Sequence, residues 1–205
     1  MNPIDRLTEA FEHFPGIGPR QARRFVQYLL TRPAGTRAEL AKAIGELGAS
    51  SAQCKSCYRW FVKTASQKGF CGVCASTSRE RGTICVVEKD ADIDGVERSG
   101  YRGLYFVLGG VVPLAAEEPE KYVRLRELVH RTEADAAKKE LSEVILGLSA
   151  TTEGDHTRAL LQEKLAPLAA ALKFKLSSLG RGLSTGSELE YADPDTIASA
   201  LNSRA

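Results

Sequence analysis

The chain has 205 residues, of which 43% are hydrophobic and 26% are charged, as is usual for a globular protein. No apolar run approaches the roughly 20 residues that a membrane-spanning helix needs, and the N-terminal stretch lacks the apolar core of a secretory signal. We therefore expect a cytoplasmic protein without a membrane segment. In that compartment paired cysteines are more often metal ligands than disulfides.

The net charge of +2 conceals an asymmetry along the chain. Residues 13–79 carry eleven Lys or Arg against two acids, Glu39 and Glu46, a net charge of +9. From Glu80 onward there are 21 acids and 16 bases, a net charge of −5. The basic part favours an anionic partner such as nucleic acid. The alternative is that the charges simply lie on solvated faces.

Residues 1 to about 50 are predicted to be helical, because apolar residues recur at helical spacing, beginning with Ile4, Leu7, Phe11 and Phe14. A second helix is expected from Pro19. A third is predicted to open with a capping box, Thr36-x-x-Glu39, and to close at Gly48. The inward face of this third helix is expected to consist of Leu40, Ile44 and Leu47.

A tight connection joins the first two predicted helices. In FPGIGPRQARRF (14–25), Gly16 and Gly18 permit a positive φ and close approach of another backbone. The following helix N-terminus offers unpaired N–H groups that suit a phosphate oxygen. One polar helix face then follows, formed by Arg20, Arg23, Arg24 and Gln27. The segment resembles a helix-hairpin-helix, which implies contact with the nucleic-acid backbone without sequence reading; the alternative is an ordinary helical hairpin with solvated arginines.

Four of the five cysteines form two C-x-x-C pairs separated by 13 residues: Cys54, Cys57, Cys71 and Cys74. Two such pairs can offer four thiolates in a tetrahedron, and we predict a structural zinc finger. Four thiolates leave no open position for water, so the zinc would not be catalytic. Two disulfides or an iron–sulfur centre are the alternatives. The fifth cysteine, Cys85, is expected to be a small buried hydrophobe. Packing, rather than stacking on bases, is the expected role of four nearby aromatic residues: Tyr58, Trp60, Phe61 and Phe70.

From Thr83 short apolar runs alternate with amphipathic stretches. Strands are predicted at 84–87, 104–108, 143–148 and 172–179, the last as an edge strand, with helices at about 118–130 and 156–170. This alternation favours a parallel α/β sheet. The acidic stretch 88–95 is expected to be a loop. A last helix is predicted to begin at Asp193-Pro194, an N-cap followed by proline.

Two motifs in this region resemble a Toprim domain, the metal-binding α/β module of topoisomerases and bacterial primases. Glu88 follows the first strand, and Glu153-Gly154 follows the third. Active Toprim domains carry Asp-x-Asp just before the Glu-Gly, but here Ser149 and Thr151 occupy those places. Without the two carboxylates little remains to hold Mg²⁺, although Glu88, Glu153 and Asp155 could still bind it weakly. The resemblance therefore implies a Toprim-like fold whose phosphoryl-transfer chemistry is lost.

The order of modules resembles the RecR family of bacterial recombination mediators over nearly the whole chain. The matching stretches are FPGIGPRQARRF (14–25), the four cysteines, VVEKDADIDGVE (86–97), YRGLYFVLGG (101–110), ATTEGD (150–155) and GLSTGSELEYAD (182–193). The resemblance implies a protein that is not an enzyme and that works with RecO and RecF to load RecA at single-stranded gaps. It also implies dimers and ring-like tetramers, assembled through the N-terminal region, with DNA passing through the ring.

The same resemblance assigns roles to individual residues. The basic residues of the family's hairpin match Arg20, Arg23 and Arg24, and its C-terminal Walker-like motif matches residues 183–193. Within that motif Glu188, Glu190 and Asp193 would serve subunit contacts or the partner RecO, and a solvated loop is the alternative.

The sequence thus predicts an α+β protein of four modules. These are a helix-hairpin-helix region (1–53), a four-cysteine zinc finger (54–74), a Toprim-like parallel α/β domain (80–178) and a C-terminal Walker-like motif with a helix (179–205). The expected function is that of a non-catalytic DNA-binding recombination mediator. The alternative is a Mg²⁺-dependent Toprim nuclease or primase-like enzyme that uses Glu88 and Glu153.

Overall fold

The computed structural model describes residues 1–65, 68–180, 182–183, 186 and 188–202 of the 205-residue chain. The chain divides into two compact units, Met1–Ser51 and Ala52–Ala205. Each unit is described by itself. Within the described part of the chain, no helix combines the length and the apolar character that crossing a bilayer requires.

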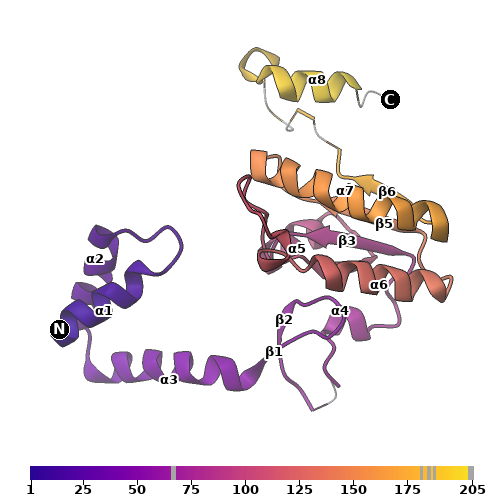
Figure 1. Ribbon diagram of the computed structural model, residues 1–205. Coiled ribbons are helices and arrows are strands. Elements are labelled where there is room, and N and C mark those ends of the chain that lie inside the picture. Colours follow the sequence, from indigo (N-terminus) through magenta and orange to yellow (C-terminus); the bar gives the residue numbers. More distant parts are fainter. Residues whose placement is uncertain (66–67, 181, 184–185, 187, 203–205) are drawn as a thin grey trace. The chain divides into compact units, whose positions relative to one another are not determined.

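The first unit consists of three helices: α1 (Pro3–Glu12), α2 (Pro19–Leu30) and α3 (Ala34–Ser50) (Figure 1). Both α1 and α2 begin with a proline in the first turn, where the missing N–H removes no hydrogen bond. They pack together through the buried Ala22 and Val26 and through an edge-to-face contact of Phe11 with Phe25, whose ring centroids lie 5.7 Å apart. The two helices thus form the expected hairpin.

The third helix differs from the sequence prediction. It begins at Ala34, directly after the extended Pro33, so Thr36 lies inside the first turn and is not the N-cap of a capping box. It also continues beyond Gly48. The apolar face expected to point inward is exposed, since no residue of α3 is buried, and its members are Leu40, Ile44 and Leu47. The described residues of the first unit therefore leave that face largely uncovered.

The second unit begins with the cysteine module. It comprises the paired strands β1 (Ser51–Gln53) and β2 (Trp60–Val62) and the short helix α4 (Gly72–Ala75). Tyr58 lies between the second cysteine and β2 in the left-handed region, with φ +61°. This conformation reverses the chain, so that the backbone N–H of Cys54 reaches the carbonyl of Arg59 at 2.8 Å.

A four-stranded parallel sheet forms the rest of the unit. Its strands are β3 (Thr83–Val87), β4 (Leu104–Val107), β5 (Glu143–Gly147) and β6 (Lys175–Ser178), in the spatial order β4-β3-β5-β6. Ile84 lies beside Leu104 on one side and Val144 on the other. All four strands occur at the predicted places, and β6 is an edge strand as expected.

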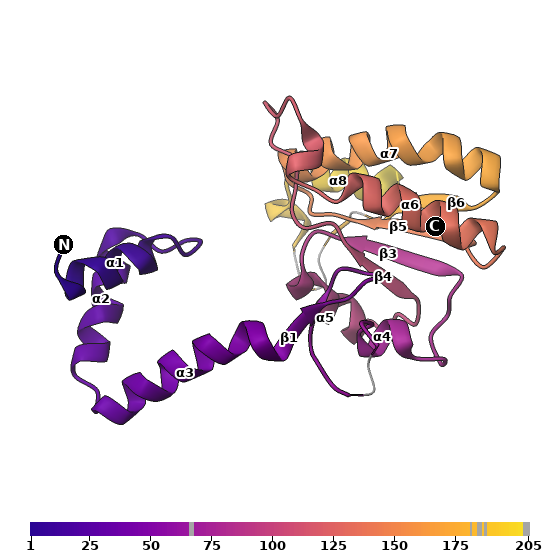
Figure 2. The ribbon, with the colours of Figure 1, turned by 60° about the horizontal axis from the view of Figure 1, so that its bottom comes forward.

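Helices cover both faces of this sheet (Figure 2). α6 (Leu125–Ala137) and α7 (Thr152–Leu172) pack on one face, where Ile84, Val86 and Phe106 are buried. On the other face, α5 (Asp90–Arg98) buries Ile93 against the remaining side chains of the central strands, which are Cys85, Val87, Tyr105 and Val107. Because both faces are covered, the strand sequences are apolar runs without alternation.

Three boundaries differ from those predicted. Residues 90–98 form α5 where a loop was expected, because the acids of its first turn suit the positive helix N-terminus, and the backbone N–H of Lys89 donates to Asp92 at 2.9 Å. The helix expected at 118–130 is divided into a 3₁₀ turn (η1, Pro119–Lys121) and α6, since Pro119 can begin a helical turn but lacks an N–H. α7 begins at Thr152, four residues before the predicted start.

The final helix, α8 (Pro194–Asn202), begins where the sequence predicts. The side chain of Asp193 accepts the backbone N–H of Thr196 at 2.8 Å, as an N-cap does. The predicted fold class is therefore confirmed: an N-terminal helical hairpin, a four-cysteine module, a parallel α/β sheet and a C-terminal helix. The four module boundaries given above stay predictions.

The cysteine module is attached to the edge of the sheet. The backbone N–H of Val107 in β4 donates to the carbonyl of Cys57 at 2.8 Å. Beside this bond the Tyr58 ring contacts Phe106 edge-to-face, with centroids 5.4 Å apart, and lies 5.3 Å from the Arg124 guanidinium. A guanidinium over a tyrosine ring adds electrostatic attraction to the apolar contact. The module and the sheet are thus held together as one packed structure.

Candidate functional site

The connection between α1 and α2 is built around one glycine with a positive φ. Gly16 has φ +76°, which side-chain-bearing residues rarely adopt. Gly18 instead has φ −90° and is the N-cap of α2, where it provides no side chain to cap the helix. The expectation of two positive φ angles is therefore correct for Gly16 alone. Pro19 has no N–H, and the N–H of Gln21 donates to the Gly18 carbonyl at 3.0 Å. The bare N-cap therefore leaves the backbone N–H of Arg20 for an external acceptor such as a phosphate oxygen.

The polar face of α2 carries exposed arginines. Arg20, Arg23 and Arg24 are all exposed, and the Arg24 guanidinium lies 3.4 Å from Gln21 Oε1. A groove of about 530 Å³ runs along this face and is lined by Pro19, Arg20, Arg23, Arg24 and Gln27. The structure thus brings the predicted basic residues together beside the open helix N-terminus.

Acidic residues of α1 limit this basic face on one side. A neighbouring groove is shared by Arg23 and Gln27 with α1, from which it takes Asp5, Glu9 and Glu12. A polyanion would be repelled from this groove and attracted to the side of α2 that carries Arg20 and Arg24. The charge distribution thus orients any polyanion on the hairpin.

The four paired cysteines converge on one point. The sulfur atoms of Cys54, Cys57, Cys71 and Cys74 all lie within 4.8 Å of one another. The Sγ atoms of Cys57 and Cys71 are 3.6 Å apart, whereas a tetrahedron of Zn–S bonds of about 2.3 Å has sulfurs about 3.8 Å apart. No disulfide joins the described cysteines. The donor set therefore fits a closed tetrahedral metal site.

The surroundings of Cys54 favour its thiolate form, which binds metals, whereas the hydrogen bonds that Cys57 and Cys74 make to Cys54 raise the pKa of those two thiols. The backbone N–H of Cys71 donates to Cys54 Sγ at 3.3 Å. The pKa of the Cys54 thiol lies below its ordinary value because the Cys57 thiol, and then those of Cys71 and Cys74, donate hydrogen bonds to its thiolate. A cation bound among the four sulfurs would stabilise the charged form further. By contrast, burial in the sheet raises the pKa of Cys85 to about 11, in keeping with a small buried hydrophobe.

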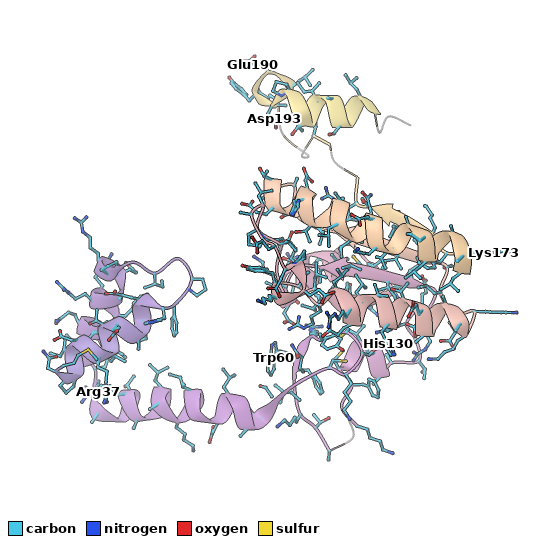
Figure 3. All side chains as sticks on the ribbon, in the orientation of Figure 1. Arg37, Trp60, His130, Lys173, Glu190 and Asp193 are labelled. Atoms are coloured by element: carbon cyan, nitrogen blue, oxygen red, sulfur yellow. The ribbon has the colours of Figure 1, made fainter. Side chains whose placement is uncertain are left out.

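The aromatic residues of the cysteine module divide into two pairs. Tyr58 packs on the sheet and Phe61 packs on the cysteine cluster, as expected. Trp60 and Phe70 remain exposed, and Trp60 points away from the module with 58% of its surface accessible (Figure 3). The expectation that all four aromatic residues pack is therefore wrong for this pair. The physical reason for Trp60 is the strand period, because residues flanking the inward Phe61 must face outward.

The Toprim-like acids do not form a cation site. The carboxylate of Glu88, just after β3, already accepts two hydrogen bonds from Ser149. The backbone N–H and the hydroxyl of Ser149 both donate to Glu88 Oε1 at 2.6 Å. Within the described part of the chain, the four cysteines are the only group of three or more Cys, His, Asp or Glu residues placed to hold a metal ion. The structure thus does not bring Glu88, Glu153 and Asp155 together, so the expected weak cation site is not formed. These residues do not fit the Mg²⁺ of an active Toprim domain.

Family models match three parts of the chain. They are a Toprim domain at residues 82–177, the helix-hairpin-helix of RecR at residues 4–47 and the C-terminal region of RecR at residues 182–204. The first match covers the parallel sheet with its helices, and the second covers the hairpin with most of α3. The third covers α8 and the segment that leads to it.

Curated relatives cover almost the whole chain. Proteins named "Recombination protein RecR" from Prochlorococcus marinus (strain MIT 9301) and Synechococcus sp. (strain JA-3-3Ab) are 36% and 38% identical to it, over 98% of this chain and 95% and 96% of their own lengths. The chain belongs to the RecR family. Another relative of the same name, from Chloroflexus aggregans (strain MD-66 / DSM 9485), is 39% identical over 98% of this chain and 93% of its own length.

The remaining acids predicted from the RecR resemblance are exposed. Glu153 lies in the first turn of α7, and Glu188 and Glu190 flank the start of a 3₁₀ turn (η2, Leu189–Tyr191). Figure 3 marks Glu190 and Asp193 at the beginning of the C-terminal helical segment. Three residues of the Walker-like motif lie outside the described residues: Ser184, Thr185 and Ser187. The structure keeps Glu153, Glu188 and Glu190 available to a partner without assigning one.

Sequence reasoning missed the residues that support these sites. Arg131 in α6 bonds the carbonyl of Ser56 at 2.7 Å and pairs with Asp135. Arg158 in α7 donates to the carbonyls of Leu148 and Ser149, each at 3.2 Å. The Arg158 contacts span nine and ten residues, but the Arg131 contact spans 75. No local pattern could have indicated the Arg131 contact, because it depends on how the module folds onto the sheet.

A substitution of Gly154 tests how closely the start of α7 packs against the preceding loop. A Cβ added there would lie 2.2 Å from the carbonyl oxygen of Ser149. We predict that Gly154→Ala lowers the free energy of unfolding by about 2–3 kcal/mol, because the loop before α7 must move. Chemical denaturation followed by circular dichroism measures this.

A matched control is Gly95→Ala in α5, where an added Cβ meets nothing within 4 Å. That change should raise the free energy of unfolding by about 0.5–1 kcal/mol, since alanine favours a helix. Equal stabilities for the two variants would contradict the close contact of Gly154 with Ser149.

Proposed function

We propose that this chain is a DNA-binding recombination mediator that makes and breaks no bonds. The observation that carries this proposal is the set of exposed arginines Arg20, Arg23 and Arg24 beside the open N-terminus of α2. Membership of the RecR family supports a role in recombination. The family resemblance further supports action with RecO and RecF in loading RecA at single-stranded gaps, in the cytoplasm.

The hairpin is suited to the DNA backbone. Gly16 allows a tight corner that a phosphate can approach, and the backbone N–H of Arg20 in the first turn of α2 could donate to it. The arginines are exposed and project from the helix surface, so they can reach phosphate oxygens without entering a groove between base pairs. Such contacts position a protein on DNA but carry no sequence information. Binding should therefore depend strongly on salt and little on sequence.

Charge reversal on α2 tests the DNA interface. The double change Arg23→Glu and Arg24→Glu should weaken binding at least about tenfold and lower the slope of log affinity against log salt by about 2, because two phosphate contacts are lost. Fluorescence anisotropy with two labelled gapped duplexes of unrelated sequence measures both quantities. The loss should be the same for the two sequences.

A charge-matched control comes from the second unit. Arg98→Glu with Arg102→Glu changes two exposed arginines of the second unit, in and after α5. This variant should keep at least most of the affinity and the original salt slope. Equal losses in the two double variants would mean that general charge, and not the hairpin, attracts DNA.

We further propose that the four-cysteine cluster holds a structural Zn²⁺. The four sulfurs form the closed donor set that zinc accepts, and no position is left for a reacting water. The module has little apolar core of its own, consisting of the cysteines with Phe61 and Val73. Metal binding would thus supply the stability that apolar burial lacks in so small a module. Zinc would brace the module against β4 while taking no part in chemistry.

Removal of one cysteine tests whether the cluster binds zinc. Cys57→Ser should reduce zinc from about one ion per chain to near zero, because three thiolates bind far more weakly than four. Elemental analysis of the purified protein gives the content, and circular dichroism should still report the folded sheet. Cys85→Ala is the control that should keep the full zinc content. Retention of zinc by Cys57→Ser would refute this ligand assignment.

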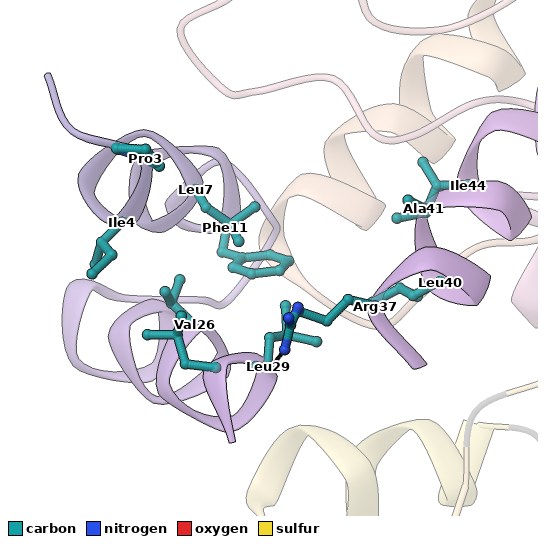
Figure 4. Close-up of a pocket in the computed structure, with 11 residues that line it drawn as sticks. Pro3, Ile4, Leu7, Phe11, Val26, Leu29, Arg37, Leu40, Ala41 and Ile44 are labelled. Atoms are coloured by element: carbon teal, nitrogen blue, oxygen red, sulfur yellow. Dashed lines mark hydrogen bonds between the residues drawn. The ribbon is translucent and has the colours of Figure 1, made fainter. Parts of the chain in front are cut away.

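We propose that the first unit pairs with a second copy of this chain. A groove of about 320 Å³ is lined almost entirely by apolar side chains of α1, α2 and α3 (Figure 4). On α3, Ile44 and Leu47 are 64% and 66% exposed. Apolar faces of this kind usually mark association surfaces. The family resemblance supports a homodimer that assembles into a homotetrameric ring around DNA.

A charge placed on this face tests the association. Ile44→Glu should raise the dissociation constant of the oligomer about 30-fold or more, because a buried apolar anchor is replaced by a carboxylate. Sedimentation equilibrium measures the constant. Lys42→Glu, about 160° around α3 from Ile44, is the control and should leave it unchanged. A wild-type protein that remains monomeric at high concentration would contradict the proposal.

The exposed acids are proposed to contact a basic partner such as RecO. Glu153, Glu188 and Glu190 are all exposed. Glu88 differs, since Ser149 already binds its carboxylate. We therefore assign partner contact to the three exposed acids and a structural role to Glu88.

A further inference from the structure

The carboxyl edge of the sheet is where a ligand is expected in this fold. The connection after β3 leads through α5 to β4, whereas that after β5 leads through α7 to β6, in the opposite direction. Ligands of open α/β sheets bind at such a switch point, outside the carboxyl ends of the two strands. Glu88 directly follows β3 and Ser149 lies just beyond β5. These two residues therefore occupy the position of a ligand site.

A continuous chain of hydrogen bonds fills this position. Glu88 Oε1 accepts the backbone N–H and the hydroxyl of Ser149, both at 2.6 Å. Ser149 Oγ lies 3.1 Å from Thr151 Oγ1, which in turn accepts the backbone N–H of Gly154 at 3.1 Å. The bonds connect the end of β3 to the first turn of α7.

The direction of every proton in this chain follows from the donors present. A hydroxyl has one proton. Ser149 gives its proton to the ionised Glu88, so it must accept the proton of Thr151. Thr151, having given its own proton, accepts that of the Gly154 N–H. All donors thus point toward the carboxylate, an arrangement in which each bond polarises and strengthens the next.

Other contacts hold the same loop from its opposite side. Arg158, which is mostly buried, donates to the carbonyls of Leu148 and Ser149 and pairs with Asp155. Gly154 allows the helix to approach Ser149 more closely than any side chain would permit. The loop between β5 and α7 is therefore fixed on both sides by groups of this chain.

We propose that the hydroxyls of Ser149 and Thr151 replace the divalent cation of active Toprim domains as the element that orders this corner. Carboxylates at both positions would face Glu88, and three negative charges require a cation between them. Two hydroxyls instead satisfy one carboxylate with protons. Glu88 is then a positioning residue for the β5–α7 loop, whose order does not depend on Mg²⁺. This inference holds whether or not the chain binds DNA.

Mn²⁺ binding, measured by electron paramagnetic resonance on the zinc-loaded protein, tests the replacement. The native protein should bind no Mn²⁺ at this corner with a dissociation constant below about 1 mM. Ser149→Asp combined with Thr151→Asp should create a Mn²⁺ site, and adding Glu88→Gln should remove it. Native Mn²⁺ binding that disappears in Glu88→Gln would overturn the proposal, as would a double variant that folds but binds no Mn²⁺.

Amide hydrogen exchange provides a readout that involves no metal. Exchange at residues 149–154 should be equal with and without Mg²⁺, and Glu88→Ala should accelerate it about tenfold or more, because hydrogen bonds to a charged acceptor are lost. Glu163→Ala, which removes an exposed acid from the middle of α7, is the control and should leave it unchanged. Protection that increases on adding Mg²⁺, or that survives in Glu88→Ala, would refute the role of the hydroxyls.

Discussion

The hydrogen bond from the Val107 N–H of β4 to the carbonyl of Cys57 joins the sheet to the cysteine module. Each of these two parts needs the other as a packing surface. β4 is an edge strand, and an uncovered edge is a site for unwanted pairing. The cysteine module has too few apolar residues to fold on their burial alone. Docking the module on the strand covers the edge and gives the module a surface to pack on through Tyr58. The metal ligands and the sheet core thus stabilise each other.

The two units carry different chemistry. The first unit presents arginines beside the N-terminus of α2. It also carries the apolar groove that α1, α2 and α3 line. The second unit has a fold that commonly binds ligands at its carboxyl edge, yet there the carboxylate of Glu88 is already bound by Ser149. The arginines of the first unit would attract a polyanion, whereas in the second unit hydroxyl and N–H groups of Ser149 hold the Glu88 carboxylate. This separation supports the proposal of a mediator that binds DNA without cleaving it.

Much of the fold and part of the site could be predicted because the signals are local. The strands, the hairpin and α8 follow from apolar periods, prolines and a capping aspartate, each of which acts within a few residues. The spacing of the cysteines likewise predicts that the four sulfurs meet. Most of the loop expected at 88–95 belongs instead to α5, because Asp90 and Asp92 lie in the first turn and favour that end of the helix.

The sequence by itself determined the order of the modules, the parallel sheet, the cysteine ligands and the arginine face of α2, since neighbouring residues specify each of them. Only the tertiary structure decided that Ile44 and Leu47 stay exposed, that Arg131 reaches Ser56 and that Ser149 binds Glu88. The last two contacts join residues 75 and 61 positions apart. Their formation depends on how strands and helices pack, which no local period or spacing encodes.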